Sequence, residues 1–314
     1  NASEKEPQFH CLIELLNHEF IEKTSISFSL AGKKKSLKIN DEPLSATRQK
    51  DVKNYFINFV SLTPKLEQLF ISGKSSKREY LDKIVQDINP NHQSHINDYQ
   101  KLLKERLLIL QKYQNNNSLA SQKWLETVET KIAELGVAIA FARVEAINFF
   151  NNAISAFSSK FPKATLVVNG EIEALTVTEK SVILEENYRQ KLKDTRKQDL
   201  LSFKTSFGVH RSDFDAIFND GKNKNISATL CSTGEQKAIM IGITLARAKI
   251  SSSYKNQPTI LIFDEVVAHL DEERKGNLFA EIIDSNLQSF FSATNSDLIP
   301  QDYLENHIQA INIS

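Results

Sequence analysis

Two blocks in the last third of the sequence combine residue types that phosphate chemistry requires. The first, residues 231–237 (CSTGEQK), places a hydroxyl and a glycine at the start of a helix-like run. The second, residues 259–265 (TILIFDE), is an apolar run that ends in two adjacent carboxylates. A helix start suits an anionic phosphate because its first backbone N–H groups lack partners within the helix. Together the two blocks predict a site for a ligand that carries phosphate.

The acidic pair that ends the second block, Asp264 and Glu265, predicts metal-assisted phosphate hydrolysis. Open α/β sheets bind their ligands at the carboxyl ends of the strands, which is where this pair would lie. We expect Asp264 to bind Mg²⁺, usually through water, and Glu265 to orient and deprotonate the attacking water. Apolar strands that end in acidic pairs also occur as plain strand ends. The block upstream and Leu270-Asp271 downstream favour the functional interpretation.

The order of these motifs resembles the second half of an ABC-type ATPase head, which has a signature loop, a Walker-B strand and a following Leu-Asp. A Ser-Thr-Gly turn that caps a helix is common, so the first block alone is a weak signal. In ABC heads the signature closes over the nucleotide of a partner head. The resemblance therefore implies an ATP-dependent dimer with residues 268–271 at its interface. The residues expected to bind the nucleotide are Ser232, Gly234, Glu235, Gln236 and Asp271.

The glycine-rich loop that cradles phosphates in such heads, G-x-x-x-x-G-K-[ST], does not occur in this sequence. The nearest match is at Gly73-Lys74-Ser75, where Gln68 stands in place of the first glycine, and it predicts a surface turn. Since ABC heads carry this loop upstream of Walker B, we expect the sequence to be N-terminally truncated. Without the loop, the chain as given is expected to have no ATPase activity.

Composition places the chain among ordinary globular proteins. Its 314 residues suffice for two domains, and 40% of them are hydrophobic and 25% charged. Lys plus Arg and Asp plus Glu both number 39, so the zero net charge gives no support for nucleic-acid binding, and any basic surface must be local. Cys11 and Cys231 are too few for a disulfide framework, and the scattered histidines indicate no zinc site.

The elements that must position the acidic pair begin with strands. Alternating apolar residues between positions 9 and 40, with a turn at residues 32–35, predict an antiparallel meander. Residues 48–56 are expected to form a short helix. Residues 56–62 are then a candidate for a buried strand, which Pro64 would stop.

From Lys77 onward the apolar period changes from two to that of a helix. Apolar residues between Ile96 and Leu110 mark one amphipathic helix, and residues 115–118 (NNNS) break it. Between Leu125 and Phe149, apolar residues recur at alternating steps of three and four, which is a heptad pattern. Two such helices predict an αα-hairpin that projects from the head. A small compact helical domain is an equally good interpretation.

Strand and helix patterns return after the hairpin, at residues 164–170 and 183–200. The predicted fold class is α/β, an ABC-type ATPase head with a mixed sheet, interrupted by an α-helical hairpin domain. The expected domains are residues 1–76 as the first part of the head, 77–163 as the helical arm and 164–314 as the second part of the head.

The complete set of motifs resembles the RecF family, bacterial recombination mediators related to the SMC-type ABC ATPases. The motifs that carry this resemblance are residues 62–64 (LTP), Gly73, residues 77–82 (KREYLD), Tyr99, residues 103–106 (LKER), 208–213 (GVHRSD), 232–237 (STGEQK) and 261–265 (LIFDE). The sequence departs from the family pattern at residues 64–66, where PKL replaces Pro-Asp-Asp and puts any role of those acids in doubt. It also has Glu265 where the family often has Asp.

The resemblance implies a cytoplasmic, ATP-dependent DNA-binding protein of replication and recombinational gap repair. Such a protein dimerises on ATP, is a slow DNA-dependent ATPase when intact, and acts with RecR and RecO to place RecA at single-strand gaps and at junctions of single and double strands. Basic residues would contact DNA phosphates without reading sequence. The candidates are Lys33–Lys35, Lys101, Lys104 and Arg106, for which a solvated face is the alternative.

Two other classes of protein are possible from the sequence. A nucleotide-independent DNA-binding or scaffold protein with a decayed ATP site would explain the missing glycine-rich loop. It would also explain why no switch histidine follows Phe290-Phe291. An SMC-like or transporter ATPase is the other class. The helical insertion argues against a transporter, and an SMC protein would need a far longer coiled coil.

Overall fold

The computed structural model describes residues 9–16, 23–31, 34–39, 42–43, 58–115, 119–219, 225–255 and 259–311. Its contacts divide the chain into two compact units, Asn1–Asn58 and Phe59–Ser314. The helix expected at residues 48–56 lies outside the described residues.

The first unit is the antiparallel meander that the sequence predicts. Its strands are β1 (Phe9–Leu16), β2 (Lys23–Ala31), β3 (Lys34–Ile39) and β4 (Glu42–Pro43), hydrogen-bonded in that order. Neighbouring strands are antiparallel throughout. The register places Ile26 opposite both Ile13 and Ile39.

The second unit contains a three-stranded sheet that holds the acidic block. The order of its strands is β10-β9-β5, with β5 at Asn58–Leu62, β9 at Thr259–Asp264 and β10 at Gln288–Ser292. The two C-terminal strands run parallel, and Ser292 lies opposite Asp264. The carboxyl ends of β9 and β10 therefore meet at one edge of the sheet.

A second sheet and a set of helices complete this unit. The sheet is antiparallel, in the order β6 (Ala164–Asn169), β7 (Asp213–Asn219) and β8 (Asn225–Ser227). The helices are α2 (Pro64–Glu67), α3 (Lys74–Gln86), α4 (His92–Asn115), α5 (Leu119–Ala156), α6 (Glu171–Leu175), α7 (Ser181–Asp194), α8 (Arg196–Ser202), α9 (Thr233–Lys255), α10 (Glu272–Asp284) and α11 (Gln301–Asn306). Short 3-10 turns are η1 (Leu69–Ile71), η2 (Val209–Arg211), η3 (Ala228–Leu230), η4 (Val266–His269) and η5 (Ser296–Leu298).

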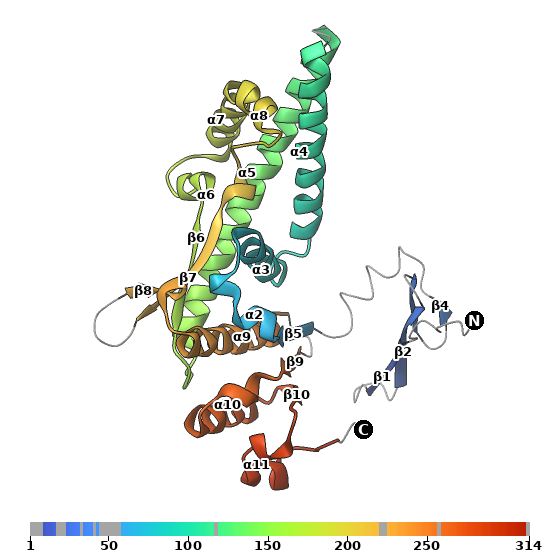
Figure 1. Ribbon diagram of the computed structural model, residues 1–314, viewed down its shortest axis with the longest axis vertical. Coiled ribbons are helices and arrows are strands. Elements are labelled where there is room, and N and C mark those ends of the chain that lie inside the picture. The colour runs from blue at the N-terminus through green and yellow to red at the C-terminus, as the bar shows by residue number, and fades with distance from the viewer. Residues whose placement is uncertain are drawn as a thin grey trace, which may run out of the picture. The chain divides into compact units, whose positions relative to one another are not determined.

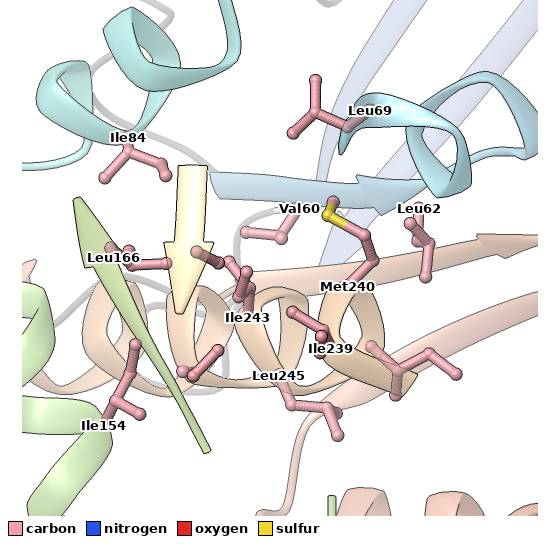
Figure 2. Packing of buried hydrophobic residues seen from close by; sticks show 14 of the residues in the cluster. Val60, Leu62, Leu69, Ile84, Ile154, Leu166, Ile239, Met240, Ile243 and Leu245 are labelled. Carbon is pink, nitrogen blue, oxygen red and sulfur yellow. The ribbon is translucent and has the colours of Figure 1, made fainter. Parts of the chain in front are cut away.

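The first hydrophobic core of this unit surrounds α9. Residues 238–241 of that helix are all buried, so α9 is an interior helix and not an amphipathic surface helix. Side chains from both sheets and from α3 and α5 surround it, as Figure 2 shows for Val60, Leu62, Ile84, Ile154, Leu166, Ile239, Met240 and Ile243. Each such buried aliphatic side chain contributes about 1.5–3 kcal/mol. This core is the rigid platform from which residues 231–237 project.

The second hydrophobic core lies within the helical arm. It joins α4 to the first two thirds of α5 and to α6 and α7. The heptad pattern of α5 is confirmed, because Leu125, Val128, Ile132 and Ile139 are all buried. Helices α7 and α8 lie beside the hairpin and contact α5 and α4 (Figure 1). The arm is therefore a compact helical domain built on the hairpin, and α5 runs from this core into the core around α9.

The arm has an arginine at its centre. Arg106 has no exposed side-chain surface, and its guanidinium donates to Glu129, to Asp199 at 2.7 Å and to the carbonyl oxygen of Leu192. A DNA-contacting role for Arg106, which the sequence suggested, is therefore wrong. Lys101 and Lys104 on the same helix are exposed.

Among the described helices, none combines the length and the apolar composition of a membrane span.

Candidate functional site

The acidic pair lies where the sequence predicts, at the carboxyl end of β9. Asp264 is the last residue of the strand and half-buried, and Glu265 follows it with an exposed side chain. The hydroxyl of Ser292, at the end of the neighbouring strand, donates to Asp264 Oδ1 at 2.7 Å. The Ser292 hydroxyl oxygen in turn accepts a hydrogen bond from the backbone N–H of Glu265 at 2.9 Å.

The backbone at Glu265 adopts the left-handed conformation, with φ 54° and ψ 14°. For a residue with a Cβ atom this conformation costs roughly 1–2 kcal/mol. The buried side chains of Val266 and Val267 follow directly and anchor the turn into the core. The strand therefore ends abruptly, and the Glu265 carboxylate is directed away from the core into solvent.

The signature block, residues 231–237, forms a capped helix start, with Ser232 as the residue before α9. The Ser232 backbone N–H and hydroxyl each donate to Glu235 Oε2 at 2.8 Å, and the Glu235 N–H donates back to the hydroxyl at 3.4 Å. This reciprocal pair is a capping box. It uses the Glu235 carboxylate within the loop itself, while Ser232, Thr233 and Gly234 remain exposed.

Two buried side chains hold the signature loop from the protein side. Gln236 is only 3% exposed, and its amide nitrogen donates to the carbonyl oxygens of Ala228 at 2.9 Å and Cys231 at 3.1 Å. Lys237 pairs with Glu67 at 2.9 Å. The family pattern has acids at positions 65 and 66, which are Lys and Leu here. The acid that pairs with the signature residue Lys237 is Glu67, one residue further along.

The start of α10 lies against the signature block. Asp271 caps α10, since its Oδ1 accepts from the backbone N–H of Arg274 at 2.8 Å. The Arg274 guanidinium reaches the carbonyl oxygen of Gly234 at 3.4 Å and Asp271 Oδ2 at 3.5 Å. Arg274 therefore links Asp271 to Gly234, two of the residues predicted to bind the nucleotide.

The blocks at residues 77–82 and 208–213 also meet, although they are far apart in the sequence. Arg143 of α5, which is 2% exposed, donates to Asp82, to Glu173 at 2.9 Å and to the carbonyl oxygen of Val209 at 2.8 Å. Burial acts to raise the pKa of Asp82, but hydrogen bonds from His92 and Arg143 lower it below its usual value. Sequence reasoning missed Arg143 because it lies in a helix that reads as apolar.

A hydrogen-bonded chain of three side chains lies beside Arg143. His210 Nε2 donates to the carbonyl oxygen of Thr205 at 2.8 Å, and His210 Nδ1 is hydrogen-bonded to the Tyr99 hydroxyl at 2.9 Å. The Tyr99 hydroxyl also shares a hydrogen bond of 2.6 Å with the Tyr188 hydroxyl. Gly208, with φ 133°, packs against both tyrosines, and a Cβ there would lie 2.1 Å from Tyr188 Oη. Burial, and the positive charges of Arg211 and Arg78, lower the pKa of His210.

The donor set at the acidic edge fits a metal ion that arrives with a ligand. No group of three or more His, Cys, Asp or Glu side chains within the described ranges could hold a metal by itself. Mg²⁺ is usually bound by one or two carboxylates together with water and substrate phosphates. With Oδ1 of Asp264 fixed by Ser292, Oδ2 takes part in no hydrogen bond or ion pair with any described residue.

A cleft of about 400 Å³ lies elsewhere, where the ends of α9 and α10 meet the segment after α5. Its lining includes Ser252, Ser253 and Lys249, and the Lys249 ammonium is paired with the buried carboxylate of Glu281 at 2.9 Å. Residues 252 and 253 are at the opposite end of α9 from the signature block. Asp264, Glu265 and Ser292 are not among the residues that line this cleft.

No protein-family model matches the chain. It is 33% identical over 302 residues to the DNA replication and repair protein RecF of Rickettsia canadensis, which covers 94% of this chain and 79% of that protein. The chain belongs to the RecF family. It is also 37% identical over 239 residues to RecF of Rickettsia bellii, covering 76% of this chain and 64% of that protein. The chain thus spans about two thirds of the length of several RecF relatives that it matches.

Solved RecF structures share the fold. The structures of the recombination mediator protein RecF of the RecFOR pathway, with ATPrS and with ATP, superpose with TM-scores of 0.74 and 0.72 at 21% and 22% identity. Each match covers 94% of this chain and 77% or 78% of the other. The predicted fold class, an α/β head of the ABC ATPase type, is confirmed.

Proposed function

We propose that this RecF-family chain carries the signature and Walker-B parts of an ATP-dependent DNA-binding protein that acts in recombinational gap repair. The observation that supports this most is the Ser292–Asp264–Glu265 edge, which presents two carboxylates to solvent at the carboxyl end of a parallel strand pair. Such an edge is where open α/β sheets bind ligands. RecF structures solved with ATP share this fold.

In the proposed reaction each carboxylate has one role. Asp264 would hold Mg²⁺, which when bound with ATP draws charge from the phosphate oxygens. Glu265 would accept a hydrogen bond from the attacking water and remove its proton. Its exposed side chain and the left-handed turn that directs it outward support this role. Ser292 holds the carboxylate of Asp264, which suits a fixed metal ligand. Ser292 binds Glu265 only through its backbone, so the Glu265 carboxylate suits a group that moves toward the attacking water.

The signature block is proposed to bind the nucleotide of a second copy of the chain. Ser232 and Gly234 are exposed at the start of α9, whose unpaired N–H groups favour phosphate. Glu235 and Gln236 would act by shaping the loop, since both side chains are already bonded within it. Asp271, at the start of α10, would lie at the same interface.

We also propose a division into head and arm. From the sequence, the head comprises residues 1–76 and 164–314 and the arm 77–163. Buried residues of α3 belong to the core around α9, and those of α6 and α7 belong to the arm core. The cores therefore support moving α3 to the head and adding α6 and α7 to the arm.

DNA binding with and without nucleotide tests the proposal. The protein, expressed as its gene encodes it, is titrated against gapped duplex DNA with Mg²⁺ and ATP, with Mg²⁺ alone, and with ATP and a chelator. We expect tight binding and dimer formation only with ATP and Mg²⁺, assisted by RecR and RecO, with RecA loading at the gap as the downstream event. Salt-sensitive DNA binding that is equally tight with and without ATP would instead favour a nucleotide-independent DNA-binding or scaffold protein.

A further inference from the structure

The hydroxyl of Ser292 joins the two acidic residues of the proposed site. It donates to Asp264 Oδ1 at 2.7 Å and accepts from the Glu265 backbone N–H at 2.9 Å. A serine hydroxyl has one proton and two lone pairs, so both bonds can form at once. Ser292 is the last residue of β10 and lies opposite Asp264 in the parallel register, so the strand pairing sets this geometry.

The bond to Asp264 determines which carboxylate oxygen is available. Oδ1 is held by the hydroxyl, and within the described part of the chain no hydrogen bond or ion pair engages Oδ2. A carboxylate fixed through one oxygen cannot rotate freely about its last torsion, so the other oxygen keeps one direction. Partners of this kind, which orient a metal ligand, typically change metal affinity 10–100-fold when they are removed.

The bond to Glu265 acts on the backbone. A left-handed residue that is not glycine persists only where its surroundings hold it. Here the Glu265 N–H is held by Ser292 on one side, and Val266 and Val267 are buried on the other. The same hydroxyl therefore supports both the direction of Asp264 and the turn that presents Glu265.

We propose that Ser292 is a positioning residue for the Mg²⁺-binding carboxylate Asp264 and for the turn at Glu265. This inference rests on the proposed ATP site. Ser292 is exposed, so water can replace its hydroxyl at little cost to the fold. Its removal is expected to alter the use of Mg²⁺ more than the stability of the protein.

Three variants of the protein, expressed as its gene encodes it, test this role. Ser292→Ala removes the hydroxyl. Ser292→Thr keeps the hydroxyl and suits a strand. Ser289→Ala is the matched control, because its hydroxyl donates to the carbonyl oxygen of Leu287 at 3.2 Å on the same strand. For each variant, ATP binding is titrated with Mg²⁺ and repeated in EDTA, and amide hydrogen exchange at Glu265 is measured without nucleotide.

We expect Ser292→Ala to raise the Mg²⁺ concentration for half-maximal ATP binding about tenfold, with ATP binding in EDTA unchanged. Exchange at the Glu265 amide should become faster. Ser292→Thr and Ser289→Ala should behave as wild type in both measurements.

Different outcomes separate this inference from the proposed function. If the wild type binds ATP with Mg²⁺ and Ser292→Ala has the same Mg²⁺ dependence, the role of Ser292 is wrong and the proposed function stands. If Ser292→Thr is as weak as Ser292→Ala, the hydroxyl is not what matters, and the role is again wrong. A wild type that binds no ATP at any Mg²⁺ concentration overturns the proposed function and the role of Ser292 with it.

Discussion

The arm core and the carboxyl edge of β9 both contain charged groups, but these groups are buried in the arm core and exposed to solvent at the edge. In the arm, Arg106 and Arg143 are buried, and several side-chain and backbone oxygens surround each guanidinium. At the edge, Glu265 is exposed and projects from a left-handed turn. Buried charges need nearly complete partnering because desolvation is costly. Exposed charges held in place by the backbone remain free for a ligand.

This contrast separates stability from function along the chain. A charge in the arm is expected to matter for folding, whereas a charge at the edge is expected to matter for nucleotide chemistry. Three substitutions and one pH titration test that separation. Two of the substitutions replace a charged side chain with an uncharged one.

The largest effect is expected at the edge. In the protein expressed as its gene encodes it, Glu265→Gln keeps the size of the side chain but removes the proposed general base, so ATP hydrolysis should fall by about 10²–10⁴-fold. The ATP-bound dimer should then persist, as measured by light scattering and phosphate release. Glu273→Gln, an exposed glutamate in the first turn of α10, is the matched control. A Glu265→Gln variant that stays monomeric with saturating ATP would contradict the proposed site.

The next effect is expected in the arm. Arg106→Met leaves the buried carboxylates of Glu129 and Asp199 without their common partner, and the free energy of unfolding should fall by about 3–5 kcal/mol. Lys104→Met, on the same helix but exposed, should leave stability unchanged. Chemical denaturation measures both. Unaltered stability in Arg106→Met together with weakened DNA binding would restore Arg106 as a DNA contact.

A pH dependence should arise where the arm meets β7. The pKa of His210 is lowered from 6.5 in the fold, by burial first and then by Arg211 and Arg78, so the unfolded chain takes up the proton first. Its contribution is complete above pH of about 6.5 and is lost as pH falls through the folded pKa. The free energy of unfolding should therefore decrease as the pH falls below about 6.5. His210→Gln should flatten this decrease, and equal slopes in the two proteins would exclude His210 as the cause.

The smallest effect is expected at the signature block. Ser232→Ala removes the cap of α9 and should cost about 1 kcal/mol of stability, with Ser232→Thr restoring it. The proposed phosphate contact adds a second expectation, which is weaker ATP-driven dimerisation in Ser232→Ala at a temperature where both proteins are folded. Thermal unfolding and light scattering separate the two. If dimerisation of Ser232→Ala is weakened only at temperatures where the variant unfolds, Ser232 acts only as a capping residue.

Local patterns explain why much of this fold was predictable. The heptad repeat of α5 predicts its buried face because the period of an α-helix fixes which residues share one side. The meander of the first unit follows from period two in the same way. The acidic pair could be placed at a strand end because an apolar run of strand length stops at Asp264. Each of these predictions uses residues that are close together in sequence.

The contacts that sequence reasoning missed join distant segments. Arg106 and Asp199 are 93 residues apart, and Arg143 and Val209 are 66 apart. The pairing of Lys237 with Glu67 and the bridge from Ser292 to Asp264 likewise connect separate elements. No local period marks such partners, so Arg106 appeared to be one more basic residue on a helix face.

The sequence alone determined the meander of the first unit, the two helices of the hairpin, the heptad face of α5 and the position of the carboxylates at a strand end. Tertiary structure decided which charges are withdrawn from water and which are exposed. The physical reason is that desolvation depends on what packs against a side chain. For Arg106 that environment comes from α5, α7 and α8, and for Asp264 it is the hydroxyl at the end of a neighbouring strand.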